Sequence, residues 1–255
     1  MASHTKPATS LCRHNDEAIF YRQNNLVEDL MGRRSFTDVM FEHILGRAPA
    51  ANEARMLDAV LVTLMEHGLT PSAVAARLIY MSSPENIQAG VSAGLLGVAS
   101  RFIGTMEDCA RLLESLAAAA EPGKAAQELA VRYREQQQAM PGFGHHLHKP
   151  DDPRAVKLLQ LSQELGVAGP GLAMLKLLAQ AVDQVAGRHI TINATGATAA
   201  VLYDMQVPIA AMRGFAVISR AAGLVAHLLE EQQRPSGRFI WDLVDKSIPF
   251  ESAKA

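Results

Sequence analysis

The chain of 255 residues has few cysteines, few aromatic residues and almost no net charge. Its two cysteines, Cys12 and Cys109, are far apart and have no CxxC or Cys/His spacing, which argues against a disulfide framework or a zinc site. The formal net charge of -2 is not the strongly basic balance of a nucleic-acid-binding protein. An anionic ligand would therefore have to be bound by arginines that gather locally.

Long uncharged hydrophobic runs are also missing. The stretch from Met1 to Asn15 is polar and lacks the apolar segment of a secretion signal, and no later apolar run of about 18 residues is free of charge. The composition, with 49% hydrophobic and 20% charged residues, is that of a globular protein. We therefore expect a soluble, cytoplasmic protein that spans no membrane and binds no nucleic acid.

Helix-forming residues dominate the rest of the chain, and stretches that alternate between apolar and polar residues are almost absent. The expected fold class is therefore all-α. Capping residues, helical periodicity and helix-ending glycines predict helices over residues 35–46, 52–68, 70–81, 105–120, 124–138, 152–166 and 208–233. Only the segment from His189 to Asn193 alternates like a strand.

A glycine-rich apolar segment separates the third predicted helix from the fourth. Its glycines, Gly90, Gly94, Gly97 and Gly104, permit close packing of helices or close approach of the backbone to a ligand. The segment does not have the pattern of a phosphate-binding loop.

The loop from Pro141 to Arg154 carries the clearest functional signal. Two glycines before His145 allow the backbone to bend sharply, so that main-chain donors are exposed and one imidazole is held at a defined point. A metal site formed by His145, His146 and His148 is disfavoured, because no Cys, Asp or Glu completes a recognised ligand spacing. Taken one by one, these residues fit a polar surface loop equally well.

The combination resembles the citrate synthase family, whose relatives carry a GxGH loop followed by DPR and a helix. Here those motifs read Gly142-Phe143-Gly144-His145 and Asp152-Pro153-Arg154. The resemblance spans roughly Leu30 to Val244. Five further segments match family patterns in the same order: 65–68 (D-H-E or D-H-G), 92–102 (the glycine-rich segment of the lyase branch), 193–196 (NVDG), 218–223 (SRxxG) and 234–235 (RP). Overall the chain looks more like the short citryl-CoA lyases, and the lyase module of ATP-citrate lyase, than like full-length citrate synthase.

This resemblance implies a citrate synthase-like architecture. Residues 1–104 and 206–255 would form a large helical domain, and residues 105–205 a smaller helical domain that closes over a cleft. It also implies a homodimer, or a higher homo-oligomer, in which Arg234 comes from the neighbouring subunit.

The resemblance further implies a site for an acyl-CoA and a small polycarboxylate. His67 and His145 would bind the hydroxyl and carboxylate end of the substrate, with His145 as the catalytic group at the hydroxyl, while Arg154 and Arg220 would clamp carboxylates. The residues implied to line the rest of the site are Phe102 at the substrate, Pro141, Gly142, Phe143 and Gly144 at the coenzyme A, and Lys149 at a phosphate. Coenzyme A would be part of the substrate or product, and neither a permanent cofactor nor a metal is expected.

Two positions depart from the citrate synthase pattern. The family histidine that polarises the thioester carbonyl aligns with Phe102, as in the lyase branch, and the more serious departure is at Thr195. The family aspartate that moves the proton on the carbon next to the thioester aligns with Thr195, which has no carboxylate. Asp204 is a poor substitute, because nine residues at about 100° each place it on the opposite face of a helix. The first hypothesis is a lyase that cleaves citryl-CoA or an analogue to an acyl-CoA, such as acetyl-CoA, and an oxaloacetate-like 2-oxo acid. A Claisen-type synthase and a non-catalytic binding paralogue are the alternatives.

Overall fold

The computed structural model describes residues 6–101 and 103–251 and is mostly helical, which confirms the all-α prediction. Its helices, in chain order, are α1 (Phe36–Leu45), α2 (Ala51–Met65), α3 (Pro71–Ser82), α4 (Ile87–Leu96), α5 (Thr105–Ala117), α6 (Pro122–Glu135), α7 (Pro153–Glu164), α8 (Pro170–Ala186), α9 (Ala194–Asp204), α10 (Ile209–Gln233) and α11 (Gly237–Ser247).

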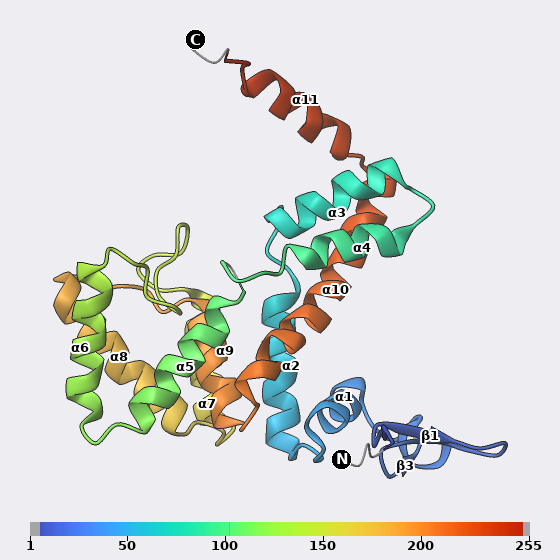
Figure 1. The fold of residues 1–255 in the computed structure, drawn as a ribbon, viewed down its shortest axis with the longest axis horizontal. Coiled ribbons are helices and arrows are strands. Elements are labelled where there is room, and N and C mark those ends of the chain that lie inside the picture. The colour runs from blue at the N-terminus through green and yellow to red at the C-terminus, as the bar shows by residue number, and fades with distance from the viewer. Residues whose placement is uncertain (1–5, 102, 252–255) are drawn as a thin grey trace, which may run out of the picture.

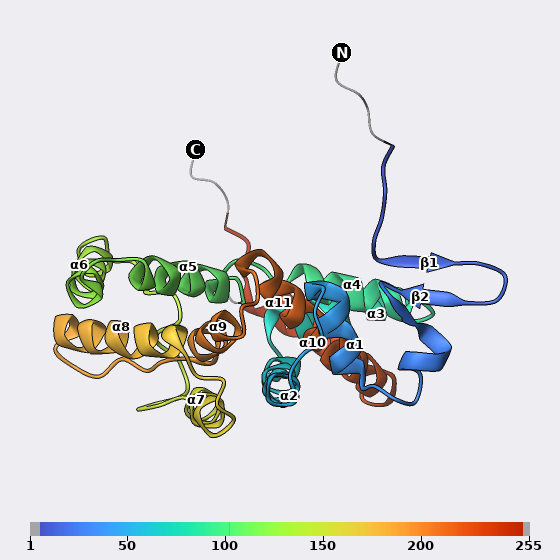
Figure 2. The same cartoon turned by 90° about the horizontal axis from the view of Figure 1, so that it is seen from below.

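The helices form two groups, as Figure 1 shows. Helices α5 to α9 lie together on one side, and α2, α3, α4 and α10 lie together on the other. In Figure 2, seen from below, the two groups lie side by side along the long axis of the molecule. The division into two domains at residues 104 and 205, and the closure of the smaller domain over a cleft, stay predictions.

The N-terminal region corrects the strand prediction. Three short strands, β1 (Cys12–His14), β2 (Ile19–Tyr21) and β3 (Asn24–Asn25), pair in antiparallel order β1-β2-β3, and a π-helical turn, η1 (Leu26–Leu30), follows. Strands this short are not long enough to show an alternating pattern. The strand expected at His189–Asn193 is wrong in extent, because it is represented in the described residues by a single bridge between Phe143 and Ile192.

The helix starts follow the capping signals in the sequence. Ser35 and Asp38 form a reciprocal capping box at the start of α1, and the Asp152 carboxylate accepts a hydrogen bond from the Arg154 amide at the start of α7. Pro71 occupies the first position of α3, where a proline costs no intrahelical hydrogen bond. Within the glycine-rich segment, α4 runs as far as Leu96.

The hydrophobic core lies mainly among α2, α5, α8, α9 and α10, where Met56, Leu113, Leu175 and Phe215 are fully buried. Helix α10 is long and apolar enough to meet the composition criterion for a membrane span. It packs against α2, α3, α4 and α5, as the core helix of a globular fold does.

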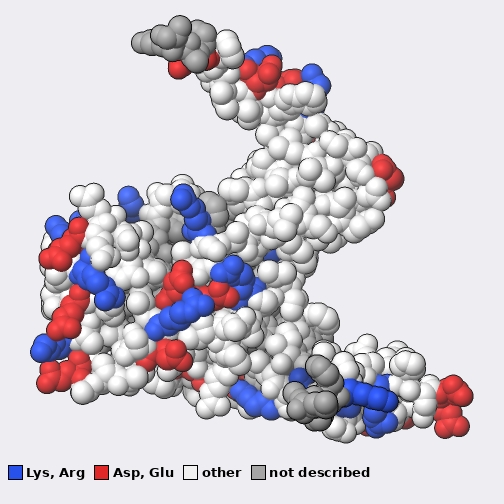
Figure 3. Space-filling model, viewed as in Figure 1, with Lys and Arg blue, Asp and Glu red and all other residues white. Residues whose placement is uncertain are grey.

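Charge is unevenly distributed over the face shown in Figure 3. Lys, Arg, Asp and Glu gather over the α5–α9 group, whereas the face over α3, α4 and α10 is almost free of them. Exposed apolar side chains on these three helices are Ile79, Ile87, Leu96, Val225 and Leu229. Helix α11 projects away from the body in Figure 1 and exposes Phe239 and Trp241.

A close approach of α10 to the end of α2 depends on Gly223. A Cβ atom at this position would lie 2.1 Å from the Met65 carbonyl oxygen, which is far inside van der Waals contact. We expect Gly223→Ala to lower the free energy of unfolding by about 1–3 kcal/mol, since the backbones must separate.

Gly214→Ala is the matched control on the same helix, because nothing lies within 4 Å of a Cβ atom at Gly214. We expect it to raise the free energy of unfolding by about 0.5–1 kcal/mol. Urea denaturation of both variants checks the pair. Equal effects of the two substitutions would contradict the close approach.

Candidate active site

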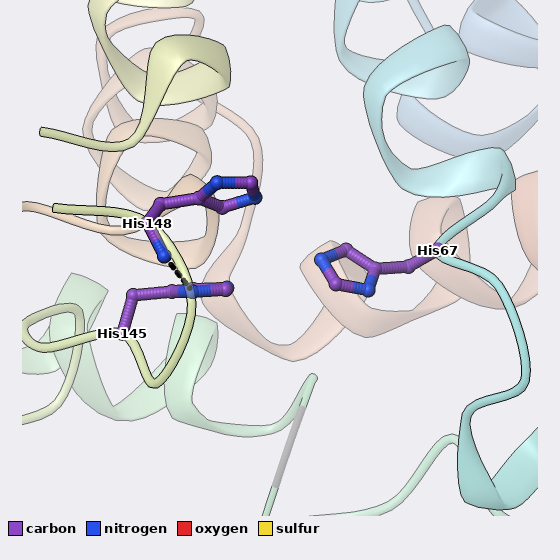
Figure 4. Close-up of side chains that lie close together, drawn as sticks. All are labelled: His67, His145 and His148. Carbon is purple, nitrogen blue, oxygen red and sulfur yellow. Dashed lines mark hydrogen bonds between the residues drawn. The ribbon is translucent and has the colours of Figure 1, made fainter.

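Three imidazoles from two distant segments meet between the helix groups. His67 lies on the loop between α2 and α3, whereas His145 and His148 lie on the loop between α6 and α7. Figure 4 shows the His67 ring pointing toward the other two. One ring nitrogen of each residue lies within 4.8 Å of one nitrogen of each of the others. All three side chains are half-buried, so they form a cluster that a ligand can still reach.

The His67 loop is held by a chain of hydrogen bonds from α10 and α3. The Glu66 carboxylate accepts hydrogen bonds from the His67 amide at 2.8 Å and from the Gly68 amide at 2.5 Å. His227 on α10 donates from Nε2 to Glu66 at 3.0 Å, and Arg77 on α3 donates to His227 Nδ1 at 2.8 Å. An arginine can only donate, so His227 Nδ1 is an acceptor and Nε2 carries the proton.

One face of α10 carries three basic side chains at intervals of two turns. Arg220, His227 and Arg234 are spaced seven residues apart, which places their side chains on the same side of the helix. Arg220 is 6% exposed; its Nε donates to the Leu64 carbonyl at 3.2 Å, and its Nη1 donates to Thr70 Oγ1 at 3.4 Å. No carboxylate of a described residue lies within ion-pair distance of Arg220. This buried cation has only neutral partners, which is the setting in which an anionic ligand is favoured.

His145 is held in one orientation by its own loop. Its Nδ1 accepts hydrogen bonds from the Leu147 amide at 3.1 Å and from the His148 amide at 3.0 Å. Arg154 Nη2 lies 3.2 Å from Nε2, and because an arginine can only donate, both ring nitrogens of His145 face donors. His145 is therefore held between the amides of its own loop and the Arg154 guanidinium.

Arg154 is fixed by a buried carboxylate two residues before it. Asp152 is fully buried and accepts from Arg154 Nε at 3.0 Å and from Nη2 at 2.8 Å. Its second oxygen also accepts from the Ala194 amide at the start of α9. Although burial acts to raise the pKa of Asp152, the Arg154 hydrogen bonds and charge hold it below its usual value. Asp152 therefore stays ionised and orients Arg154.

The electrostatic environment of the imidazoles is cationic. Burial lowers the pKa of His67, and the charges of Arg154, His148 and Arg220 lower it further. Burial also lowers the pKa of His145, with His148 as the next cause. Burial lowers the pKa of Arg220 as well, although the Glu66 charge opposes this shift. Near neutral pH, His67 and His145 are therefore neutral groups beside two arginines.

The predicted coenzyme A loop is attached to the start of α9. The Gly142 carbonyl accepts from the Asn193 amide at 3.0 Å, and the Gly144 amide donates to the Thr191 carbonyl at 2.7 Å. Gly142 and Gly144 have φ angles of 85° and 79°, which side chains rarely tolerate. A Cβ atom at Gly196 would lie 2.4 Å from the Gly142 carbonyl oxygen, so the two backbones cross closely. Pro141 and Phe143 belong to the same loop, and Lys149 is exposed beyond it.

Thr195 takes part in a hydrogen-bond chain at the start of α9. Its Oγ1 donates to Asn193 Oδ1 at 2.7 Å, so in its contact with Thr105 Oγ1 at 3.1 Å it accepts. Asp204 does not replace the missing carboxylate, because its oxygens accept from the amides of Gly169, Gly171 and Leu172 at the start of α8. This confirms that Asp204 faces away from the site.

Two predicted residues are not among the side chains of the cluster. Phe102 lies outside the described residues, so the structure does not place it. Arg234 is exposed at the end of α10, fourteen residues after Arg220, or about 21 Å along the helix axis. Arg234 therefore does not join the cluster of its own chain.

The histidine cluster differs from the metal site considered from the sequence. The third histidine of the cluster is His67 in place of His146. His146 is exposed, and its ring stacks on the His145 ring with the centroids 4.9 Å apart. A metal on His145 Nε2 would require Nδ1 to carry a proton, but Nδ1 already accepts from two amides. The adjacent Arg154 charge also repels a cation. The residues present therefore fit an anionic ligand better than a metal ion.

The model of the family described as the C-terminal domain of citrate synthase matches residues 14–241, so the chain belongs to the citrate synthase family. Citryl-CoA lyase from Hydrogenobacter thermophilus has a similar structure, with a TM-score of 0.86 and 27% identity, over 98% of this chain and 96% of that chain.

Two relatives are longer than this chain. ATP citrate lyase from Methanothrix soehngenii, solved with citrate and coenzyme A, matches 100% of this chain and 43% of that chain, with a TM-score of 0.78 and 17% identity, which shows the fold alone. ATP-citrate synthase subunit 1 of Sordaria macrospora is 24% identical over 213 residues, which are 77% of this chain and 31% of that protein. The chain thus spans less than half of either relative.

Sequence reasoning brought together His67, His145, Arg154 and Arg220, and it missed the residues that support them. His227 is one of these supporting residues, and its spacing of seven residues from Arg220 is a sequence signal that could have indicated it. Arg77 had no such signal, since its partners on α10 are 150 or more residues away along the chain.

We predict that His227→Leu releases the His67 loop. Loss of the hydrogen bond to Glu66 leaves that carboxylate without its α10 partner, and a hydrogen bond to a charged group is worth about 1.5–3 kcal/mol. Amide hydrogen exchange at His67 and Gly68 should therefore accelerate by about tenfold or more.

Gln232→Leu is the matched control for this loop. It removes another hydrogen bond between α10 and α3, from Gln232 to the Tyr80 hydroxyl at 2.7 Å, without touching Glu66. Exchange at His67 that responds equally to both variants would contradict the role of His227.

A surface histidine makes the end of the His145 loop sensitive to pH. His189 contacts Asp183 at 2.8 Å and Asp151 at 3.1 Å, and these hydrogen bonds raise its pKa. The contacts of protonated His189 therefore stabilise the fold fully below the pKa of about 6.5 that the residue has in the unfolded chain. This stabilisation is lost as the pH rises through the higher pKa that His189 has in the folded protein. We predict that His189→Gln costs stability at pH 5.5 and little at pH 9. Urea denaturation between pH 5.5 and pH 9 measures the free energy of unfolding of this variant, and His14→Gln, at an exposed position in the hairpin, is the control. A loss of stability that does not depend on pH would contradict the role of His189.

Proposed function

We propose that this chain is a carbon–carbon lyase that cleaves citryl-CoA, or a related 3-hydroxy-3-carboxyacyl-CoA, to an acyl-CoA such as acetyl-CoA and an oxaloacetate-like 2-oxo acid. The observation that carries the proposal is the buried guanidinium of Arg220, which has no carboxylate partner among the described residues and lies near His67 and Arg154. The similarity to citryl-CoA lyase over nearly the full length of both chains supports it.

In this proposal the clamp holds the polycarboxylate end of the substrate. Arg220 and Arg154 bind carboxylates, because the planar guanidinium fork pairs with two carboxylate oxygens. His67 binds at the hydroxyl and carboxylate end between them. Each charge-assisted hydrogen bond contributes about 1.5–3 kcal/mol, which offsets the burial of like charges in one site.

His145 acts at the tertiary hydroxyl, as the resemblance implies. Its Nδ1 faces two loop amides, and its Nε2 faces Arg154 Nη2. Because both ring nitrogens already face donors within the protein, proton removal from the substrate hydroxyl needs a second group.

Coenzyme A enters the proposal as part of the substrate or product and not as a resident cofactor. The loop of Pro141, Gly142, Phe143 and Gly144 lies against the start of α9, which also carries Thr195. Thr195 hydrogen-bonds near the thioester, and the exposed Lys149 contacts a phosphate of coenzyme A. Phe102, which lies outside the described residues, keeps the role at the substrate that the resemblance implies.

A homodimer, or a higher homo-oligomer in the cytoplasm, completes the proposed site. Arg234 lies too far from its own cluster to bind the same substrate and so would serve the neighbouring subunit. The face over α3, α4 and α10 in Figure 3, with few charges and several exposed apolar side chains, supports self-association.

Thr195 favours a second candidate, a non-catalytic protein that binds an acyl-CoA or a polycarboxylate. Its hydroxyl donates to Asn193 and accepts from Thr105, which leaves no carboxylate base at that position. The same site working in the synthetic direction, as a Claisen-type synthase, is the remaining alternative.

The test is an assay of a panel of 3-hydroxy-3-carboxyacyl-CoA thioesters, in which acyl-CoA and 2-oxo acid are measured together and binding is measured in parallel. We expect citryl-CoA or an analogue to be cleaved. Arg220→Lys should lower kcat/KM by about 30-fold, equivalent to about 2 kcal/mol, because a lysine cannot form the bidentate pair. Arg188→Lys, at an exposed position on the turn after α8, should have no effect.

The outcomes separate the three candidates. Tight binding of coenzyme A without turnover of any thioester supports the binding protein and overturns the lyase. Net condensation from acyl-CoA and 2-oxo acid supports the synthase. A large gain of citryl-CoA cleavage in Thr195→Asp shows that citryl-CoA itself is not the natural substrate.

A further inference from the structure

His148 is the member of the histidine cluster to which no role has yet been given. Its ring stacks on His145 with the centroids 4.4 Å apart and meets His67 edge-on at 6.2 Å. Its backbone amide donates to His145 Nδ1 at 3.0 Å, which fixes the start of the side chain (Figure 4). The imidazole is therefore held in the site and faces His67 across it.

The carboxylates near the cluster cannot take up a proton without breaking structural contacts. Glu66 accepts from two amides and from His227. Asp152 is fully buried and is bound by the Arg154 guanidinium and the Ala194 amide. Neither oxygen pair is directed to a ligand, so no carboxylate among the described residues near the histidines is placed to act as a base.

The other two imidazoles are also poor bases in this arrangement. Both ring nitrogens of His145 are engaged within the protein, Nδ1 by two loop amides and Nε2 by Arg154 Nη2. His67 faces the charges of Arg154 and Arg220, which disfavour its protonation. No hydrogen bond within the described part of the chain engages the His148 ring, so it keeps a nitrogen lone pair for a ligand.

We propose that His148 is the catalytic base and acid of this site: it takes the proton from the substrate hydroxyl and returns it to the carbon next to the thioester. The proposal deepens the proposed lyase function and rests on it. It assigns to the His148 imidazole the proton transfer that Thr195 cannot perform.

The step balances without any further reactant. The His148 ring nitrogen takes the hydroxyl proton, the hydroxyl oxygen becomes a carbonyl oxygen, and the carbon–carbon bond breaks. The electron pair of that bond moves into the thioester as an enolate. The protonated imidazole then gives its proton to the enolate carbon, which yields the acyl-CoA and restores neutral His148.

One imidazole can serve both atoms because they are close neighbours in the substrate. The hydroxyl oxygen and the carbon that becomes the enolate carbon are bonded to the same tertiary carbon. A nitrogen in hydrogen-bond contact with the oxygen is therefore near the carbon as well, and a small tilt of the ring transfers the proton.

Charged and titratable groups surround the His148 imidazole. They are His67 and Glu66 from the α2–α3 loop, His145 and His146 from its own loop, Asp152 and Arg154 at the start of α7, and Arg220 from α10. A bound polycarboxylate would pair with the two arginines and so hold the substrate hydroxyl beside the imidazoles.

The test compares His148→Gln with His146→Gln in the full chain, with citryl-CoA or the best substrate of the panel. Glutamine retains hydrogen bonding but cannot carry the proton. His148→Gln should lower kcat by about 10²–10⁴-fold with KM changed by a few-fold at most, and it should flatten the acid limb of the kcat profile. His146→Gln, which alters the exposed histidine on the other face of His145, should behave as wild type.

Rescue by a free base separates catalysis from structural support. Added imidazole should restore part of the kcat of His148→Ala in proportion to its neutral form, and citrate should bind both His148 variants as it binds wild type. Wild-type kcat in His148→Gln overturns this inference and leaves the lyase proposal intact. A kcat loss in His148→Ala that imidazole never restores overturns it as well. A wild-type chain that cleaves no member of the panel overturns the lyase proposal and this inference together.

Discussion

The crossing of α10 over the end of α2 is the contact on which the site depends. Gly223 has no side chain at this point, so the Met65 carbonyl approaches the α10 backbone directly. One turn before it, Arg220 reaches the α2 carbonyl of Leu64, and one turn after it His227 reaches Glu66. The same few residues thus join two helices and position the loop that carries His67.

The site places cations together at a cost that the fold itself does not recover. Arg220 is buried with neutral partners, and Arg154 is near enough to act on the pKa of both Arg220 and His67. Like charges in a low-dielectric environment repel each other more strongly than they do in water. Asp152 compensates part of this charge by pairing with Arg154, and the rest is available to an anionic ligand. Binding of such a ligand would therefore relieve repulsion between these cations, as is common where a protein sacrifices stability for function.

The sequence predicted the helices better than it predicted the small elements and the supporting contacts. Helix starts at Ser35, Pro71 and Asp152 followed from local capping chemistry, which acts within four residues. The hairpin strands were missed because two or three residues carry no periodicity. The pairing of His227 with Glu66 spans 161 positions, and no local pattern reports a contact at that separation. Ordered motifs located His67, His145, Arg154 and Arg220, but they could not reveal that the His145 ring lies between two loop amides and Arg154, since only the folded loop brings these groups together.

The two halves of the site differ in how closely they follow the family pattern, and this difference limits the possible chemistry. The half that would hold a polycarboxylate keeps its imidazoles and guanidiniums in contact. At the thioester half, Thr195 is bound into a chain from Thr105 to Asn193 that contains no carboxylate. A site that retains only the first half can bind a substrate tightly and still leave it unchanged, because uniform binding does not lower the barrier to reaction. Turnover therefore requires that a group on the polycarboxylate side handle the proton, and the loop from Gly144 to His148 is where the titratable groups gather. In the proposed reaction, the loop that positions the substrate oxygen is thus also the place where the chemistry at the neighbouring carbon originates.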